Sequence, residues 1–125
     1  MNIALWIVAG LLALMFAAAG LMKLTRARSE LSAKDGMGWV EDYSDAAVKA
    51  IGALEAVAAI GLVLPALLDI APVLTAWAAT GLLLMMAGAA IVHLRRGETR
   101  FVAVNLVLLC LAAFVAWGRF GSYSF

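Results

Sequence analysis

The chain has 125 residues, of which 66% are hydrophobic and 14% charged, and its mean hydropathy is +1.06. Ordinary soluble domains are about half apolar and about a quarter charged. A chain this short has too little interior to hide the excess, so much of its apolar surface must face lipid. The net charge is +1, and no basic tract is interleaved with aromatic residues, so we expect no nucleic-acid partner.

Four apolar runs reach or approach the roughly 20 residues that a helix needs to cross a bilayer core of about 30 Å. They predict helices over residues 3–24, 46–64, 72–94 and 101–117. Pro65 is expected to end the second helix, and Pro72 suits the first turn of the third. The predicted fold is all-α, a four-helix transmembrane bundle that forms one domain over residues 1–125.

The basic residues predict how the bundle is oriented. Eight of the nine Lys and Arg residues lie near the first and third connections, whereas Arg119 lies on the opposite side. Positive residues stay cytoplasmic, so both termini are expected on the outer face and residues 25–45 as a cytoplasmic loop. No basic residue precedes the first run, which favours a retained helix; the A-x-A pattern at Ala17 and Ala19 keeps cleavage as the alternative.

Each predicted helix carries one polar side chain toward the same face of the membrane: Lys23, Glu55, His93 and Asn105. A polar group at bilayer depth is costly, which makes it a functional-site hypothesis. Side chains tilt toward the N-terminus of their own helix. Lys23 and His93 therefore lean into the membrane, whereas Glu55 and Asn105 lean toward the cytoplasm. We predict that the four line one ligand-binding pocket that opens to the cytoplasm.

Small residues share a helical face with three of these side chains, as helix contacts in membranes favour: Ala19, Gly20, Gly52, Ala58, Ala59, Ala89 and Ala90. Each polar residue also has a structural interpretation. Lys23 could anchor at the interface, His93 could be interfacial, and Asn105 could donate an interhelical hydrogen bond. Glu55 lies deeper, so it is neutral, paired with Lys23 or His93, or faces a water-filled cavity.

Glu55 and His93 are the candidate catalytic residues, because histidine readily changes charge between about pH 5 and 8 and a carboxyl group can exchange protons with it. Asn105 could orient a carbonyl or hydroxyl group. Together these groups suit the polar head of an amphipathic molecule such as a quinone. No metal site is expected, since one His and one Glu match no ligand pattern. Cys110 is the only cysteine and cannot form a dithiol.

Several segments resemble the DoxX-like family of small bacterial four-helix membrane proteins over nearly the whole chain: Ala18–Leu24, Ile51–Glu55, Gly61–Pro65, His93–Glu98 and Asn105–Leu108. The four polar side chains fall on positions that recur in that pattern. The family takes its name from a subunit of a thiosulfate:quinone oxidoreductase. The resemblance therefore implies a quinone-linked redox role, membrane or peripheral redox partner proteins, and a location in the bacterial inner membrane.

The favoured hypothesis is a DoxX-like integral membrane protein that binds a quinone or another lipid-like molecule as part of a membrane redox system. Quinone is the one cofactor that these considerations suggest. Two alternatives remain: a small transporter or proton-coupled carrier that works as a homo-oligomer, and a non-catalytic membrane anchor subunit. The sequence leaves open whether the protein is an enzyme.

Overall fold

A computed structural model describes residues 1–125 as an all-helical chain, which confirms the predicted fold class. The elements are α1 (Asn2–Thr25), α2 (Arg28–Ser32), the 3-10 helix η1 (Gly38–Asp42), α3 (Asp45–Leu67), α4 (Leu74–Arg95) and α5 (Thr99–Phe120). Of these, α1, α3, α4 and α5 are long and apolar enough to cross a membrane. The two short helices belong to the polar loop, residues 26–44, between α1 and α3.

The predicted boundaries on either side of the α3–α4 turn are wrong by two or three residues. α3 continues through Pro65 to Leu67, because proline removes one backbone donor while its φ stays compatible with a helix. The chain then turns where Asp69 takes a positive φ of 53°. α4 begins at Leu74 and not at Pro72, since the amides of Leu74, Thr75 and Ala76 bond three residues back, as in a 3-10 turn.

The last helix also extends past its predicted end at Trp117. α5 runs through Gly118 to Phe120. A Cβ built on Gly118 would lie 2.6 Å from Leu5 Cδ1, so this glycine admits a side chain of α1 into the helix contact. Glycine at this position therefore serves packing between helices, as small residues commonly do in membranes, and does not break the helix.

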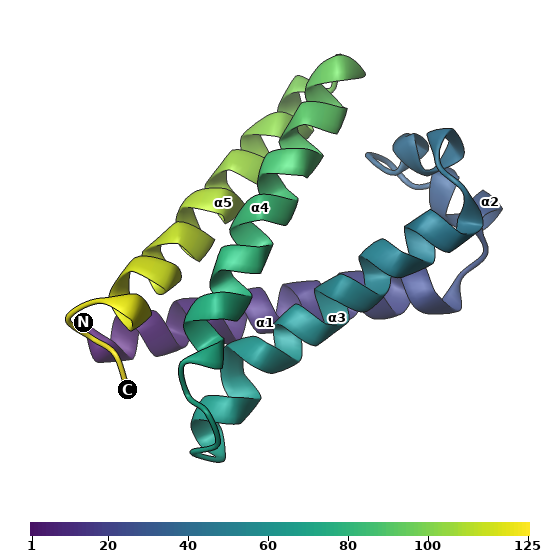
Figure 1. The fold of residues 1–125 in the computed structure, drawn as a ribbon. Helices are drawn as coiled ribbons and strands as arrows, with labels where there is room; N and C mark the ends of the chain where they lie inside the picture. The colour runs from purple at the N-terminus through teal and green to yellow at the C-terminus, as the bar shows by residue number, and fades with distance from the viewer.

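The four long helices form two pairs, α1 with α3 and α4 with α5. Figure 1 shows that the pairs lie close together at the end that carries both termini and diverge toward the end that carries α2. At the closed end, Thr75 Oγ1 donates a hydrogen bond to Leu62 O at 3.0 Å and joins α4 to α3. Arg119 Nη1 likewise donates to Asn2 Oδ1 at 2.7 Å and joins α5 to α1.

The main apolar core lies between the two pairs and draws on all four long helices. Its buried members are Ala9, Leu12, Phe16, Ala58, Ala59, Leu62, Ala79, Leu82, Met86, Ala112 and Val115. Many large apolar side chains remain exposed on the outside of the same helices, among them Leu14, Val57 and Leu84. Exposed apolar surface on this scale is the pattern of a protein whose solvent is the bilayer.

The polar loop folds onto the α1–α3 pair through a small core of its own. Leu31, Val40 and Val48 are buried together there, with Met37 and Trp39 packed against them. Apolar burial against α3 therefore fixes the loop at the open end of the molecule. This position brings the loop next to the polar side chains of the long helices.

Candidate functional site

α1 and α3 cross closely near the open end of the molecule, the end at which the two helix pairs diverge. A Cβ built on Gly20 would lie 2.6 Å from Gly52 O, and one on Gly52 would lie 2.7 Å from Lys23 Cβ. Only residues without a side chain allow the two backbones to approach this far. The crossing places Lys23 and Glu55, which follow Gly20 and Gly52 by three residues, against each other.

Lys23 and Glu55 form a buried ion pair across this crossing. Lys23 Nζ donates to Glu55 Oε1 at 2.6 Å, and the two residues are only 7% and 4% exposed. Of the partners considered for Glu55 from sequence, the structure therefore selects Lys23. Because the pair carries no net charge, it brings strong hydrogen-bonding groups to this depth without leaving a buried charge uncompensated.

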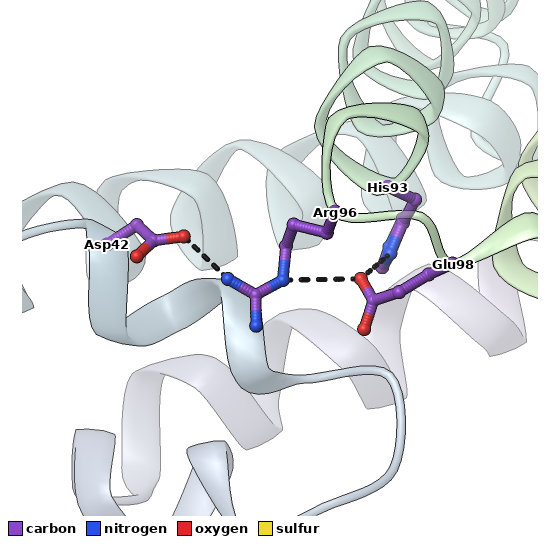
Figure 2. Close-up of polar contacts among 4 residues, drawn as sticks. All are labelled: Asp42, His93, Arg96 and Glu98. Atoms are coloured by element: carbon purple, nitrogen blue, oxygen red, sulfur yellow. Dashed lines mark hydrogen bonds and ion pairs between the residues drawn. The ribbon is translucent and has the colours of Figure 1, made fainter.

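His93 has a different partner, which the sequence reasoning missed. His93 Nδ1 lies 2.9 Å from Glu98 Oε1 (Figure 2). The imidazole also stacks on Phe101, with ring centroids 5.4 Å apart. The alternative in which Glu55 pairs with His93 is not observed, because His93 pairs with Glu98, just beyond the end of its own helix. Glu98 in turn contacts Arg96 Nε at 3.4 Å.

The end of α4 explains how Glu98 reaches His93. Gly97 has a φ of +72°, the amide of Glu98 donates to His93 O at 2.9 Å, and the amide of Gly97 donates to Leu94 O at 3.1 Å. This is a Schellman motif, which brings the second residue after the helix cap back over the last turn. A glycine three residues after the predicted end of the helix at Leu94 was the sequence signal for this contact.

Asn105 contributes a hydrogen-bond donor that the protein leaves unused. Its side chain is buried on α5, and Nδ2 has no hydrogen-bond partner. A buried donor without a partner costs about 1–3 kcal/mol, so such atoms are uncommon in native proteins and call for a reason. A ligand carbonyl or hydroxyl oxygen would satisfy this amide.

A single cavity of about 490 Å³ brings the four polar residues together, since Lys23, Glu55, His93 and Asn105 all line it. Its volume falls within the range of about 300–1,000 Å³ that is typical of small-molecule sites. Most of the wall is apolar and comes from all four long helices. The apolar lining residues are Met15, Phe16, Ala19, Ile51, Leu54, Met85, Met86, Ala89, Val92, Phe101 and Leu108, with Met37, Trp39 and Tyr43 from the polar loop.

The polar loop closes one side of this cavity, a role that the sequence did not reveal. We call residues 35–43 the rim segment, because five of them line the cavity. Two ion pairs join the rim segment to the α4–α5 side: Arg96 Nη1 donates to Asp42 Oδ2 at 2.6 Å, and Arg100 pairs with Asp35. Lys23 Nζ also lies 6.0 Å from the centroid of the Trp39 ring.

The site does not extend to the ionisable residues at the other end of the bundle. Neither Asp69 nor Arg119 lines the cavity. Arg119 is buried at the closed end, where it donates to Tyr123 O at 2.8 Å and lies 3.9 Å from the centroid of the Phe125 ring. No three His, Cys, Asp or Glu side chains lie close enough together to hold a metal ion.

Four lipid-facing helices around one apolar cavity with a polar end define a small multi-pass integral membrane protein. The model of the DoxX-like family matches residues 7–115, and the chain belongs to that family. No curated protein and no solved structure matches it.

Proposed function

We propose that this DoxX-like protein binds the head group of a quinone or another lipid-like molecule in the cavity, as a component of a membrane redox system. One observation carries the proposal. Lys23, Glu55, His93 and Asn105, contributed by four different helices, line a single apolar-walled cavity. Convergent polar groups in an otherwise apolar pocket are the pattern of a small-molecule site.

The balance of charge favours a neutral head group over an ion. Lys23 and Glu55 neutralise each other at 2.6 Å, so a bound anion or cation would meet no free opposite charge there. Burying an unpaired charge is costly, whereas a carbonyl or hydroxyl group needs only hydrogen bonds. Asn105 Nδ2 supplies a free donor for such an oxygen. The apolar walls then suit the ring and the isoprenoid or acyl chain.

We place the cavity at the cytoplasmic face of the bacterial inner membrane. The two ends of the molecule differ in charge, because every Lys and Arg except Arg119 lies toward the open end. Positive residues stay cytoplasmic, so the termini are outside. A Ser124→Cys variant in a Cys110→Ser background should react with an impermeant maleimide added to spheroplasts. Labelling only after membrane disruption would show that the termini are cytoplasmic and the orientation is the opposite one.

Two glycines of α4 offer a matched test of the binding site. Gly88 lines the cavity and Gly81 does not, yet a Cβ at either position would meet no atom within 4 Å. A Gly88→Phe variant should fold normally and fill the cavity, whereas Gly81→Phe should place the same ring elsewhere. Equilibrium dialysis of the detergent-purified protein with decylubiquinone measures the affinity of each.

We expect wild type and Gly81→Phe to bind alike and Gly88→Phe to bind at least about tenfold more weakly, a loss of about 1.4 kcal/mol. Equal binding by Gly88→Phe would place the ligand outside the cavity. A wild-type protein that binds no quinone and retains no lipid in native mass spectrometry would favour the anchor subunit. The same spectra report whether the protein is a homo-oligomer.

A further inference from the structure

A chain of polar contacts runs from the cavity to the rim segment. It passes from His93 to Glu98, from Glu98 to Arg96, and from Arg96 to Asp42 (Figure 2). The guanidinium of Arg96 thus lies between two carboxylates, at 3.4 Å from Glu98 and 2.6 Å from Asp42. Glu98 is a quarter exposed and forms an ion pair with this cation.

The contact with Glu98 determines which nitrogen of the neutral imidazole carries the proton. An ionised carboxylate can only accept hydrogen bonds, so the 2.9 Å contact requires a proton on His93 Nδ1. In the neutral ring the proton is then absent from Nε2, which becomes an acceptor. His93 Nε2 makes no hydrogen bond within the protein.

The other ionisable groups that line the cavity do not compete for this nitrogen. Lys23 and Glu55 pair with each other, and Asp35 pairs with Arg100. Tyr43 stacks edge-on against Trp39 at 5.8 Å. Among the polar atoms of these lining residues without a partner in the protein are therefore an acceptor on α4, His93 Nε2, and a donor on α5, Asn105 Nδ2.

We infer that the site selects the hydroxyl form of its ligand, a quinol in preference to the matching quinone, and that Glu98 sets this preference by fixing the tautomer of His93. The inference rests on the proposed function and specifies the substrate class of the same site. A quinol hydroxyl donates to His93 Nε2, whereas a quinone carbonyl at that place would meet a second acceptor. The far oxygen of either form can accept from Asn105. Glu98 acts through His93 and is a positioning residue.

The tautomer can be measured without any ligand, because His93 is the only histidine in the chain. Protein labelled with ¹⁵N-histidine gives signals from one imidazole, and long-range ¹H–¹⁵N correlations distinguish its two nitrogens. At about pH 8.5, where an ordinary imidazole is neutral, wild type should carry its proton on Nδ1. A Glu98→Ala variant should lose that preference, while Glu41→Gln, an exposed carboxylate without an ion pair, should keep it.

Binding supplies the second readout, with decylubiquinol and decylubiquinone compared anaerobically by equilibrium dialysis. We expect wild type to bind the quinol about tenfold more tightly, and the ratio to approach one in Glu98→Ala, because one hydrogen bond to the ligand distinguishes the two forms. If the imidazole proton of wild type lies on His93 Nε2, or if wild type binds both forms equally, the inference is overturned and the proposed function stands. Failure of both forms to bind would overturn the inference, and the proposed function as well if native mass spectrometry also shows no retained lipid.

Discussion

Lys23 and Glu55 lie 32 residues apart in the chain, yet their side chains meet at 2.6 Å where α1 crosses α3. The crossing depends on Gly20 and Gly52, at which any added Cβ would collide with the facing helix. The polar end of the cavity is therefore built by backbone approach, and the same contact determines both stability and the geometry of the site. Variants can separate these two roles.

Removing one member of the ion pair should destabilise the protein more than removing both. Lys23→Met leaves the Glu55 carboxylate buried without a cation, and we expect the free energy of unfolding to fall by about 3–5 kcal/mol. The double variant Lys23→Met/Glu55→Leu should recover most of this loss, because no buried charge remains. Unfolding in mixed detergent–SDS micelles measures the stability of each variant.

Ligand affinity should follow a different order from stability. The double variant should bind decylubiquinone weakly although it folds, since the polar end of the cavity is gone. If the double variant were as unstable as the sum of the two single variants, the pair would not be a coupled unit. If it bound as tightly as wild type, the pair would have no part in recognition.

Substitution of the glycines tests the helix crossing itself. Gly52→Ala places a Cβ 2.7 Å from Lys23 Cβ, so the helices must separate and the protein should lose about 1–3 kcal/mol of unfolding free energy. Gly10→Ala in α1 is the control, because its Cβ meets no atom within 4 Å. Similar effects of the two substitutions in the same unfolding assay would show that the crossing is not tight.

Much of this end of the molecule could be predicted from sequence. The four runs indicated the helices, and the direction of each crossing indicated that Lys23, Glu55, His93 and Asn105 point toward one end. The small residues beside Lys23 and Glu55, among them Gly20 and Gly52, indicated that these faces make helix contacts. These inferences succeed because bilayer thickness, helix geometry and side-chain tilt leave few alternatives.

The rest depended on contacts that no periodic pattern encodes. Glu55 pairs with Lys23 because α1 crosses α3 at that point. His93 pairs with Glu98 because the Schellman motif brings that carboxylate back over the last turn of α4. The rim segment is too short and irregular for a hydropathy pattern. Its place over the cavity is fixed by Leu31 and Val40 of the polar loop, which are buried together against Val48 at the start of α3.

A backbone substitution in the Schellman motif tests how the same histidine, His93, is held. Gly97 takes a φ of +72°, where a side chain is strained, so Gly97→Ala should loosen the turn that holds Glu98 against His93. We expect the imidazole proton of ¹⁵N-labelled protein to lose its preference for Nδ1. Because Gly97 has no atom near its absent Cβ, packing should not change. An unaltered imidazole spectrum would show that the turn does not position Glu98.

The ion pairs of the rim segment should control how fast a ligand exchanges. Asp35 and Asp42 bind Arg100 and Arg96 across the mouth of the cavity, and both acids are largely exposed. Exposed pairs contribute about 0–1 kcal/mol each, so Asp35→Asn/Asp42→Asn should hardly change stability. It should raise the dissociation rate of decylubiquinone in stopped-flow displacement, as should added salt, whereas Glu41→Gln should not. An unchanged rate would mean that the ligand leaves by another path.

The location of the bound molecule is the most direct test of the site. A quinone analogue that carries a diazirine on its ring, photolysed with the protein in liposomes, labels the residues that surround the head group. We expect labelled peptides from the neighbourhood of Lys23, Glu55, His93 and Asn105, and their loss in Gly88→Phe but not in Gly81→Phe. Labelling confined to lipid-facing residues such as Leu14 and Leu84, unaffected by Gly88→Phe, would contradict a binding site in the cavity.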